Sequence, residues 1–563
     1  MDNLGETADG AQQNERDAGT RAAPWWRGAV VYQVYLRSFA DGDGDGVGDI
    51  AGLRARLPYL RDLGADAIWL NPWYPSPMVD GGYDVSDYRD IAPVFGTLAT
   101  ADALIGEAHE QGLRVLIDLV PNHTSDRHPW FQAALAAGPG SPERERYWFR
   151  RGRGEAGELP PNNWESAFGG PAWTRVTEPD GRPGEWYLHL YAPEQPDLNW
   201  GNGEVRAEFE SILRFWFDRG IDGIRIDVAH GLDKDPALPD LVSGPGGALV
   251  PAGEEHPYRD RPGVLEIYRS WRKVADAYPG DRVFVAEAWV DGPQRVARYV
   301  GPGCLHTAFN FPFLTCPWSP RGFREVIGES LAALHAVGAP ATWVLSNHDC
   351  VRHVSRYGRA RARMDGPHFH PESPFDLQLG TRRARAAALL MLALPGGAYL
   401  YQGEELGLWE VEDLPEEVLQ DPRWEWSGHT DRGRDGCRVP MPWSGSAPPF
   451  GFGPDGSRPW LPQPPEWRDY TAEAQARDPG SMLELYRAAL RMRRSHPALG
   501  DGTLRWLGSP ADVLVFARDP GFCCAVNFSA GPVPLPAHEQ VLLASGPLDG
   551  DRLPGDTAAW LRI

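Results

Sequence analysis

The segment GIDGIRIDVAH, from Gly220 to His230, carries the strongest structural signal in the chain. A strongly periodic helical segment ends at Gly220, and the isoleucines that follow indicate a short, fully buried strand. Side chains alternate between the two faces of a strand, so Arg225 and Asp227 share one face while isoleucines occupy the other. This pattern is typical of a parallel barrel strand that is covered by helices and opens onto a site at its carboxyl end. A structural ion pair at the strand end is the alternative.

Length and composition narrow the class of protein. A chain of 563 residues exceeds what one hydrophobic core usually supports, so we expect two or three domains, one of them large enough for a barrel. No apolar run is long enough to cross a bilayer, and the net charge of -22 disfavours nucleic acid and anionic membrane surfaces as partners.

The cysteines and the N-terminal residues indicate in which cellular compartment the protein is expected. The six cysteines show no CxxC pair and no zinc-like spacing, so a disulfide framework is not expected. Residues 1–23 are polar and acidic, as in a disordered lead-in and unlike a signal peptide. The expected location is therefore the cytoplasm.

An acidic, glycine-rich loop, DGDGDGVGD at 41–49, follows a predicted first strand near 30–35. Its spacing begins like an EF-hand loop but lacks the glutamate at position twelve, where Gly52 stands. Closely spaced oxygen ligands suit a hard cation, so a structural Ca²⁺ or Mg²⁺ is predicted, with a flexible acidic turn as the alternative. No cofactor is expected in catalysis. The predicted metal residues are Asp41, Asp43, Asp45, Val47 and Asp49.

Helical and strand-like segments alternate along much of the chain. Helical periodicity at 50–63 precedes an apolar run at 67–70, and a second helical segment at 100–111 precedes another at 113–120. Repeated strand and helix units predict a parallel sheet or barrel. The alternation fails between about 124 and 200, where Pro, Gly and Trp accumulate, so an inserted subdomain is expected there.

Polar residues stand at the ends of further predicted strands. RVFVAEAW places Glu287 at one strand end, ATWVLSNHD brings His348 and Asp349 to another, and GGAYLYQGEE ends in two glutamates. Barrel enzymes keep their chemistry at the carboxyl ends of the strands, whereas structural ion pairs would have no reason to gather there. The pattern therefore favours an enzyme.

Five motifs occur in one order: DLVPNHTS at 118–125, QPDLNW at 195–200, GIRIDVAH at 223–230, VAEAW at 285–289 and SNHD at 346–349. In order and spacing they resemble glycoside hydrolase family 13, the α-amylase family, and most closely its α-glucosidase and oligo-1,6-glucosidase branch. The resemblance covers nearly everything from Trp25 to the C-terminus. It implies a (β/α)8 TIM barrel with an inserted subdomain after strand 3 and a C-terminal antiparallel β domain.

The expected domains follow from this resemblance. Residues 1–23 form the lead-in, 24–123 and 201–501 the two parts of the catalytic barrel, 124–200 the inserted subdomain B, and 502–563 the C-terminal β domain.

By the same resemblance, Asp227 is the nucleophile, Glu287 the general acid and base, and Asp349 the third carboxylate that grips the sugar. Retaining hydrolysis needs two carboxyl groups about 5 to 5.5 Å apart across the glycosidic bond. Asp227 must stay ionised, and Arg225 on the same strand face is expected to lower its pKa. Glu287 must hold a proton, for which partial desolvation or a nearby Asp349 would raise its pKa.

The family also implies contacts to the sugar. His123 and His348 match histidines that hydrogen-bond sugar hydroxyls and stabilise charge developing on the ring. Tyr83 is expected to stack under the sugar and Phe168 to line the pocket. The partner is therefore a small oligosaccharide, and the sequence does not predict an oligomeric state.

A pair between Asp80 and Arg438 is expected to wall off the pocket behind the first glucose. The predicted enzyme is then a retaining exo-α-glucosidase that releases α-glucose from short, α-1,4-linked malto-oligosaccharides. In this branch a valine directly after the nucleophile, here Val228, tends to accompany α-1,6 cleavage. One methyl group changes the linkage preference only slightly, so the loops around the leaving group can override its effect. An oligo-1,6-glucosidase, a trehalose synthase or a sucrose-acting transglucosylase remain alternatives, as does a non-catalytic sugar-binding or transporter-partner protein.

Overall fold

The computed structural model describes the chain except residues 1–22, 245–248, 252 and 254. Nearly all of the expected lead-in, 1–23, therefore lies outside the described residues. Among the described residues, no helix combines the length and the apolar character that crossing a membrane requires.

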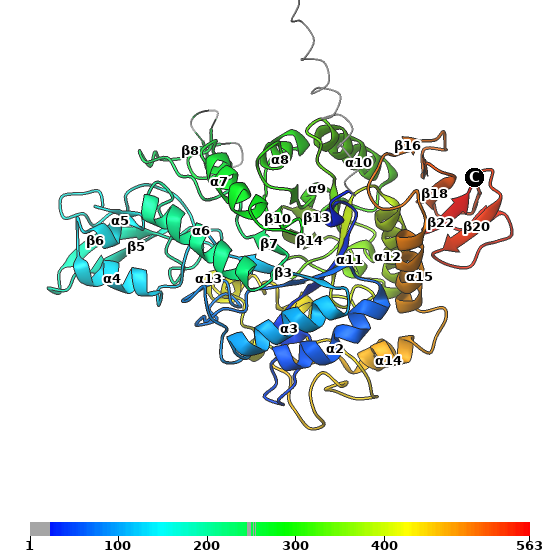
Figure 1. Ribbon diagram of the computed structural model, residues 1–563, viewed down its shortest axis with the longest axis horizontal. Coiled ribbons are helices and arrows are strands. Elements are labelled where there is room, and N and C mark those ends of the chain that lie inside the picture. Colours follow the sequence, from blue (N-terminus) through cyan, green and yellow to red (C-terminus); the bar gives the residue numbers. More distant parts are fainter. Residues whose placement is uncertain (1–22, 245–248, 252, 254) are drawn as a thin grey trace, which may run out of the picture.

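Eight parallel strands form a nearly closed barrel at the centre of the molecule, in the order β11-β10-β7-β3-β2-β1-β15-β12 (Figure 1). The predicted barrel is confirmed. The strands are β1 (Val30–Val34), β2 (Ala67–Leu70), β3 (Arg114–Leu119), β7 (Gly223–Ile226), β10 (Val283–Ala286), β11 (Thr307–Ala308), β12 (Thr342–Val344) and β15 (Gly397–Tyr401).

Side chains on the two faces of the strands pack into different clusters. The inward-facing Val31, Trp69, Leu116, Val283 and Val285 fill the interior of the barrel. The residues between them point outward and join the larger core beneath the surrounding helices. Because both faces of the strands are buried, most of their residues are apolar.

Helices cover the outside of the barrel. The helix α6 (Gly203–Asp218) shows why: Asn202 caps its start by accepting from the Glu204 N–H, and one face of the helix is buried. The other covering helices are α2 (Ile50–Leu63), α3 (Leu98–Glu110), α7 (Val264–Asp276), α8 (Pro293–Tyr299), α9 (Phe311–Leu314), α10 (Pro320–His335), α11 (His353–Tyr357), α12 (Leu377–Ala393) and α15 (Met482–Ser495). Two shorter helices, α13 (Pro422–Trp426) and α14 (Ala472–Gln475), lie in the segment between β15 and α15.

A small subdomain follows β3 and projects to one side of the barrel in Figure 1. Its three-stranded antiparallel sheet has the order β4-β6-β5. A bridge between His123 and Asp197 joins its two ends at the barrel. Its elements are α4 (Pro129–Ala137), α5 (Pro142–Glu145), β4 (Phe149–Arg150), β5 (Trp173–Thr177) and β6 (Pro183–Leu188).

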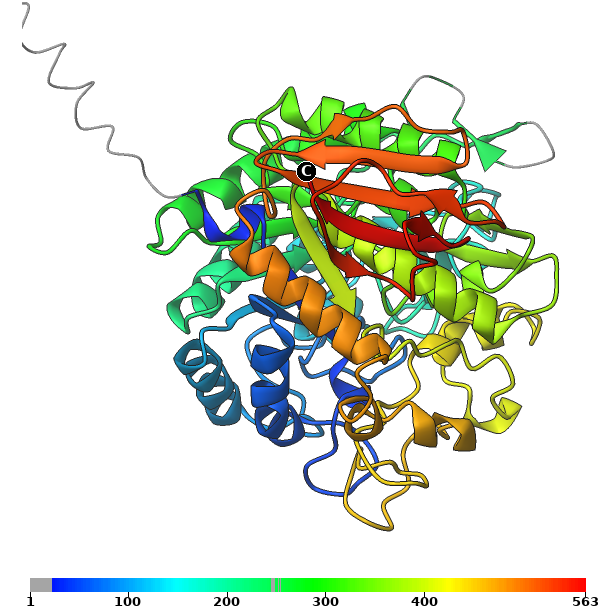
Figure 2. The same ribbon diagram turned by 90° about the vertical axis from the view of Figure 1, so that its right-hand side faces the viewer.

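The C-terminal sheet packs on the opposite side and faces the viewer in Figure 2. Its five strands are antiparallel, in the order β16-β17-β18-β22-β20, and Trp560 of this sheet donates to the Leu389 carbonyl of α12. The strands are β16 (Arg505–Trp506), β17 (Val513–Arg518), β18 (Phe522–Asn527), β20 (Gln540–Ala544) and β22 (Thr557–Arg562), with a small pair β19 (Val533–Pro534) and β21 (Arg552–Leu553) beside them. The predicted C-terminal β domain is thus present.

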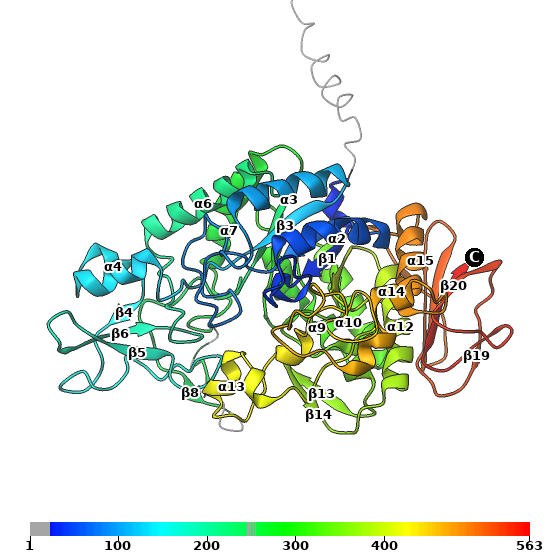
Figure 3. The ribbon, with the colours of Figure 1, turned by 90° about the horizontal axis from the view of Figure 1, so that it is seen from below.

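Two short hairpins leave the barrel along the lower edge of Figure 3. They are β8 (Val242–Ser243) with β9 (Leu249–Val250), and β13 (Ala362–Asp365) with β14 (His368–Pro371). Residues from both hairpins and from α13 line one cavity, which opens at the carboxyl ends of the barrel strands.

Candidate active site

A cavity of about 770 Å³ contains the three carboxylates that the sequence singled out. Asp227 and Glu287 directly follow β7 and β10, and Asp349 lies in the loop after β12. Parallel strands end at one rim of a barrel, which is why residues 122 positions apart meet in one site. The predicted residues that line the cavity are Asp80, Tyr83, His123, Phe168, Asp227, Val228, Glu287 and Asp349.

The Arg225 guanidinium lies beneath the reacting carboxylates. Its Nη1 donates to Asp118 Oδ1 (2.8 Å) and to Asp227 Oδ1 (2.6 Å), and its Nη2 lies 3.7 Å from Glu287 Oε2. Arg225 is also predicted to be a substrate-binding residue, but its side chain is 2% exposed and does not line the cavity. Instead, the Arg225 guanidinium lies between Asp227 and Glu287 and interacts with both carboxyl groups.

Burial raises the pKa of Asp227, and Glu287 adds to this, whereas Arg225 lowers it. The sequence predicted only the contribution of Arg225. Burial likewise raises the pKa of Glu287, to about 7, against the effect of Arg225 and with the help of Asp349. Because Asp227 has the 2.6 Å ion pair with Arg225, the proton that this pair of acids shares is favoured on Glu287.

The backbone at Val228 ties the two acids together. Its N–H donates to Glu287 Oε2 at 2.7 Å, while the preceding residue is the nucleophile. Val228 has a φ of 45°, which is a strained conformation for a β-branched residue. The turn after Asp227 therefore both ends β7 and orients Glu287.

Asp349 is held by two arginines. Its Oδ1 accepts from Arg434 Nη1 (3.0 Å) and from Arg438 Nη2 (3.1 Å), and its Oδ2 lies 3.3 Å from His348 Nε2. Burial acts to raise the pKa of Asp349, but the neighbouring histidine and arginines hold it well below its ordinary value. This carboxylate is ionised whenever the enzyme is folded at neutral pH.

The arginine that pairs with Asp80 is Arg434, and the predicted pair with Arg438 is wrong. Arg434 Nη2 donates to Asp80 Oδ1 at 2.6 Å, and both side chains are less than 10% exposed. Arg438 lies behind the cavity wall, where its Nε donates to the His348 carbonyl at 2.8 Å. We call the wall formed by Asp80, Asp349 and Arg434 the sealed end of the cavity.

His348, for which a sugar contact is predicted, does not line the cavity either. The side chain is fully buried, and its ring stacks on Tyr83, with centroids 5.4 Å apart and planes 8° apart. The Gln33 amide lies 2.7 Å from Nδ1, so the proton is assigned to Nε2, which points at the Tyr83 hydroxyl (2.6 Å). Tyr83 itself lines the cavity and donates to Asp118 Oδ2 at 2.9 Å, so His348 positions Tyr83.

Tyr191 and Gln195 complete the wall around His123 and were missed by the sequence analysis. Tyr191 lines the cavity, with its ring centroid 5.3 Å from His123 and 5.5 Å from Phe168. Gln195 Nε2 lies 3.1 Å from His123 Nε2 and 3.3 Å from Asp80 Oδ2. Gln195 opens the QPDLNW motif, so its place in that motif was the available signal.

A buried lysine joins the subdomain to the nucleophile loop. The chain has only two lysines, and the ammonium group of Lys234 is fully buried. It binds Asp197 Oδ2 (2.9 Å), Asn122 Oδ1 (2.9 Å) and the Gly231 carbonyl (2.8 Å). Three acceptors satisfy the three N–H groups of an ammonium, a geometry that the planar guanidinium does not match.

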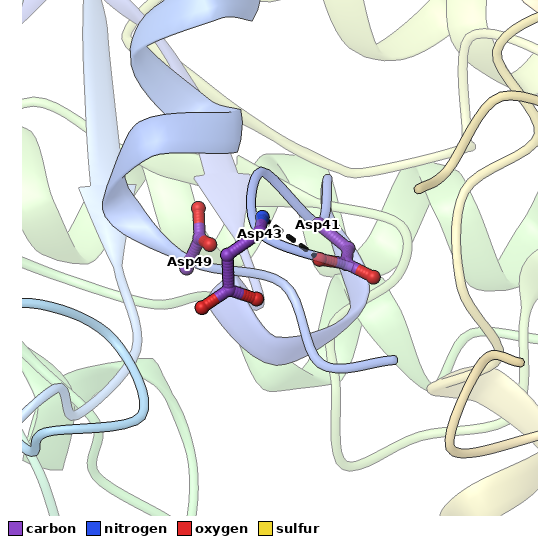
Figure 4. A group of neighbouring side chains, drawn as sticks. All are labelled: Asp41, Asp43 and Asp49. Carbon is purple, nitrogen blue, oxygen red and sulfur yellow. Dashed lines mark hydrogen bonds between the residues drawn. The ribbon is translucent and has the colours of Figure 1, made fainter. Parts of the chain in front are cut away.

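The acidic loop brings three of its predicted ligands together at the start of α2 (Figure 4). One carboxylate oxygen from each of Asp41, Asp43 and Asp49 lies within 4.8 Å of the others. Asp45 does not belong to this group, and its Oδ1 accepts the Val47 N–H at 2.8 Å. Three of the four carboxylates that the sequence predicted as ligands are therefore close together in the structure.

The comparisons with known proteins agree with this geometry. The family model described as "Alpha amylase, catalytic domain" matches residues 33–502. The probable alpha-glucosidase of Rhizobium meliloti (strain 1021) is 38% identical over 550 residues, covering 93% of this chain and 92% of that protein. The oligo-1,6-glucosidase of Parageobacillus thermoglucosidasius is 35% identical over 510 residues, covering 85% of each.

Solved structures show the same similarity. The alpha-glucosyl transfer enzyme XgtA matches with a TM-score of 0.83 and 38% identity, covering 96% of this chain and 100% of that chain. The trehalulose synthase MutB from Pseudomonas mesoacidophila MX-45 matches with a TM-score of 0.83 and 30% identity over the same shares. The predicted family and the predicted glycoside hydrolase activity are confirmed. The chain therefore belongs to the α-amylase family, glycoside hydrolase family 13, within its α-glucosidase and oligo-1,6-glucosidase branch.

Proposed function

We propose that the enzyme is a retaining, exo-acting α-glucosidase that releases α-glucose from the non-reducing ends of short, α-1,4-linked malto-oligosaccharides. The observation that carries this proposal is the buried ion pair between Asp80 and Arg434, 2.6 Å long, in the cavity wall. An oligosaccharide cannot continue through a closed wall, so only a terminal glucose fits between this pair and the two reacting acids.

Each acid has one task in this reaction. Asp227 attacks the anomeric carbon while Glu287 gives its proton to the leaving oxygen, and the glycosidic bond breaks. The alcohol leaves with that proton, and the glucosyl group stays on Asp227 as an ester. Glu287, now ionised, takes a proton from the water that attacks the ester, so α-glucose is released with its configuration retained. Asp349 stays ionised and stabilises the positive charge that develops on the sugar ring.

The preferred linkage depends on the side chains around the leaving group. Val228 lines the cavity directly beside the nucleophile, which favours an oligo-1,6-glucosidase as the second candidate. A change of one methyl group alters substrate preference by only about 1 to 3 kcal/mol, so the loops around the leaving group have the larger influence.

Initial rates on maltose, isomaltose, sucrose, trehalose and starch test the proposal, with the anomer of the released glucose followed by proton NMR. We expect maltose to react fastest and α-glucose to appear first. Faster consumption of starch than of maltose would contradict the closed pocket, and trehalose formed from maltose would identify an isomerase. Maltose binding without any release of glucose would identify a sugar-binding protein.

We also propose a structural Ca²⁺ or Mg²⁺ held by Asp41, Asp43 and Asp49. Hard oxygen donors suit both ions, and the carboxylates keep free lone pairs although backbone N–H groups of Gly44 and Gly52 occupy some of them. Millimolar CaCl2 should raise the melting temperature above its value in EDTA, and Asp43→Asn should abolish that increase. An equal shift in the variant would contradict the site.

A cytoplasmic location completes the proposal. All six cysteines are free and buried, as in proteins of reducing compartments. Fractionation of the producing cells would test this directly, since recovery of the activity in the medium would contradict it.

A further inference from the structure

A second cavity, separate from the catalytic one, has a volume of about 250 Å³. Pockets for drug-sized ligands measure about 300 to 1,000 Å³, so this cavity suits a smaller molecule. Much of its lining is aliphatic or aromatic, and apolar contact with a ligand is therefore available. The apolar lining consists of Val351, Phe369, Pro371, Val411, Leu414 and Leu419.

Two segments of the chain form part of both cavity walls. Pro367 and His368 of the β13–β14 hairpin line the catalytic cavity, whereas the next residue, Phe369, lines the second cavity. Gly433 lines the second cavity, and the residue after it, Arg434, belongs to the sealed end of the catalytic cavity. The second cavity therefore lies behind the sealed end, and a molecule bound there would contact the loop that carries Arg434.

One carboxyl group in the second cavity is buried and has an oxygen without a partner. Glu410 is 7% exposed, and its Oε2 accepts the Arg352 N–H at 3.0 Å. Its Oε1 accepts no hydrogen bond from the residues that the structure describes. Gly436 stands beside this oxygen, because a Cβ at that position would lie 2.5 Å from Oε1. A buried carboxyl oxygen requires a donor, so the donor to Oε1 is expected to come from a molecule in the cavity.

The other two charged groups in the lining already have partners. Arg359 Nη2 donates to both oxygens of Glu412, at 2.6 and 2.7 Å. Arg432 donates to the Leu414 carbonyl. The lining thus contains two carboxyl groups and one guanidinium, and Glu410 is the group that remains to bind a ligand. This balance of charge favours a cation over an anion.

We propose that the second cavity binds a small organic ammonium ion, which donates an N–H to Glu410 Oε1 while its alkyl chain packs against the apolar lining. A hydrogen bond between charged groups is about twice as strong as one between neutral groups. A neutral alcohol donates as well but leaves the charge of a buried carboxylate without compensation. An anion would face two carboxyl groups.

Isothermal titration calorimetry with ethyl-, propyl- and butylammonium chloride, at an ionic strength held constant with sodium chloride, tests the proposal. We expect one ion per chain and an affinity that rises by up to about fourfold per methylene until the alkyl chain fills the cavity. Butanol and butyrate are the matched neutral and anionic molecules, and each should bind about tenfold or more weakly than butylammonium. Equal affinity for butanol and butylammonium, or no saturable binding of the ammonium ions, would overturn the proposal.

The catalytic cavity also contains carboxylates, so the two cavities must be distinguished. In Asp227→Asn, maltose should occupy the catalytic cavity without being hydrolysed. Butylammonium should bind this variant with the same affinity in the absence and in the presence of saturating maltose. Displacement of butylammonium by maltose would place the ion in the catalytic cavity and would overturn the inference.

Variants of the lining connect the binding to its cause. Glu410→Gln keeps an acceptor for the Arg352 N–H but removes the charge, so butylammonium should bind it about tenfold or more weakly. Leu419→Ser replaces a half-buried apolar side chain of the lining and should reduce the gain in affinity per methylene.

Glu466→Gln is the matched control, because it removes the same charge at an exposed position outside the cavity and should bind butylammonium as the parent does. Unfolding temperatures would verify that each variant is folded. Parent affinity for butylammonium in Glu410→Gln would overturn the proposal.

Discussion

The sealed end and the leaving-group end of one cavity are lined by different kinds of side chain. At the sealed end, Arg434 lies among three carboxylates, and its ion pairs with Asp80 and Asp349 are 2.6 and 3.0 Å long. At the leaving-group end, the apolar side chains of Leu241, Leu249, Tyr258, Trp289 and Val290 line the cavity, and polar groups such as His230 and Arg423 also line it. Buried ionic hydrogen bonds are directional, whereas apolar contact depends mainly on area. We therefore expect strict recognition of the glucose at the sealed end.

The largest effect should come from the residue between the two ends. Asp227→Asn keeps the shape of the side chain but removes the nucleophile, so kcat should fall by about 10⁴-fold or more on maltose. Asp276→Asn is the matched control, since Asp276 also binds an arginine, at 2.8 Å, but lies exposed on α7. Near-normal turnover by Asp227→Asn would show that another group attacks the sugar.

Opening the sealed end should produce the next largest effect. Arg434→Leu leaves Asp80 and Asp421 buried without their partner, and breaking a buried pair costs about 3 to 5 kcal/mol. We expect kcat/KM for maltose to fall by about 10²-fold or more, while the rate on starch relative to maltose increases. Arg477→Leu, which removes an exposed arginine paired with Glu473, is the control. An unchanged starch-to-maltose ratio would argue against a closing role for Arg434.

Docking of the subdomain should depend on one lysine. Lys234→Met has a similar length but leaves Asp197 buried and unpaired, so the free energy of unfolding should fall by about 3 to 5 kcal/mol. Lys273→Met changes the other lysine of the chain, which is exposed on α7, and should have little effect. Denaturant unfolding of both variants measures the difference, and equal stability would contradict the structural role of the buried ammonium.

The smallest effect concerns pH. Burial raises the pKa of Glu287 to about 7, and the acid must be protonated to act, so kcat/KM should fall as pH rises through about 7. Since kcat/KM reports ionisations of the free enzyme, maltose and isomaltose should show the same alkaline limb. If kcat/KM fell at different pH values for the two substrates, a group other than Glu287 would contribute to the decrease.

The two arginines of one loop show where prediction from sequence stopped. Arg434 and Arg438 stand four residues apart, and the motif comparison selected the second as the partner of Asp80. The chain path places a short 3-10 helix, Asp435–Cys437, between them, so the first points into the cavity wall and the second behind it. The number of residues between two arginines does not determine on which side of a turn each side chain lies.

Buried histidine and arginine side chains show the same limit. The motifs drew attention to His348 and Arg225 as substrate-binding residues. In the structure both side chains are buried, and they contact Tyr83 and Asp227 respectively. The apolar wall at the leaving-group end had no motif, because its residues come from the loops after β7 and β10 and acquire a common surface only by packing.

Local sequence was sufficient for the alternation of strands and helices, the inserted subdomain and the three carboxylates that follow barrel strands. These features depend on periodicity and on short motifs, which neighbouring residues encode directly. The pairing of Asp80 with Arg434, the burial that raises the pKa of Glu287 and the apolar wall required the folded chain. Each of them depends on distance and solvent exclusion between segments far apart in the sequence.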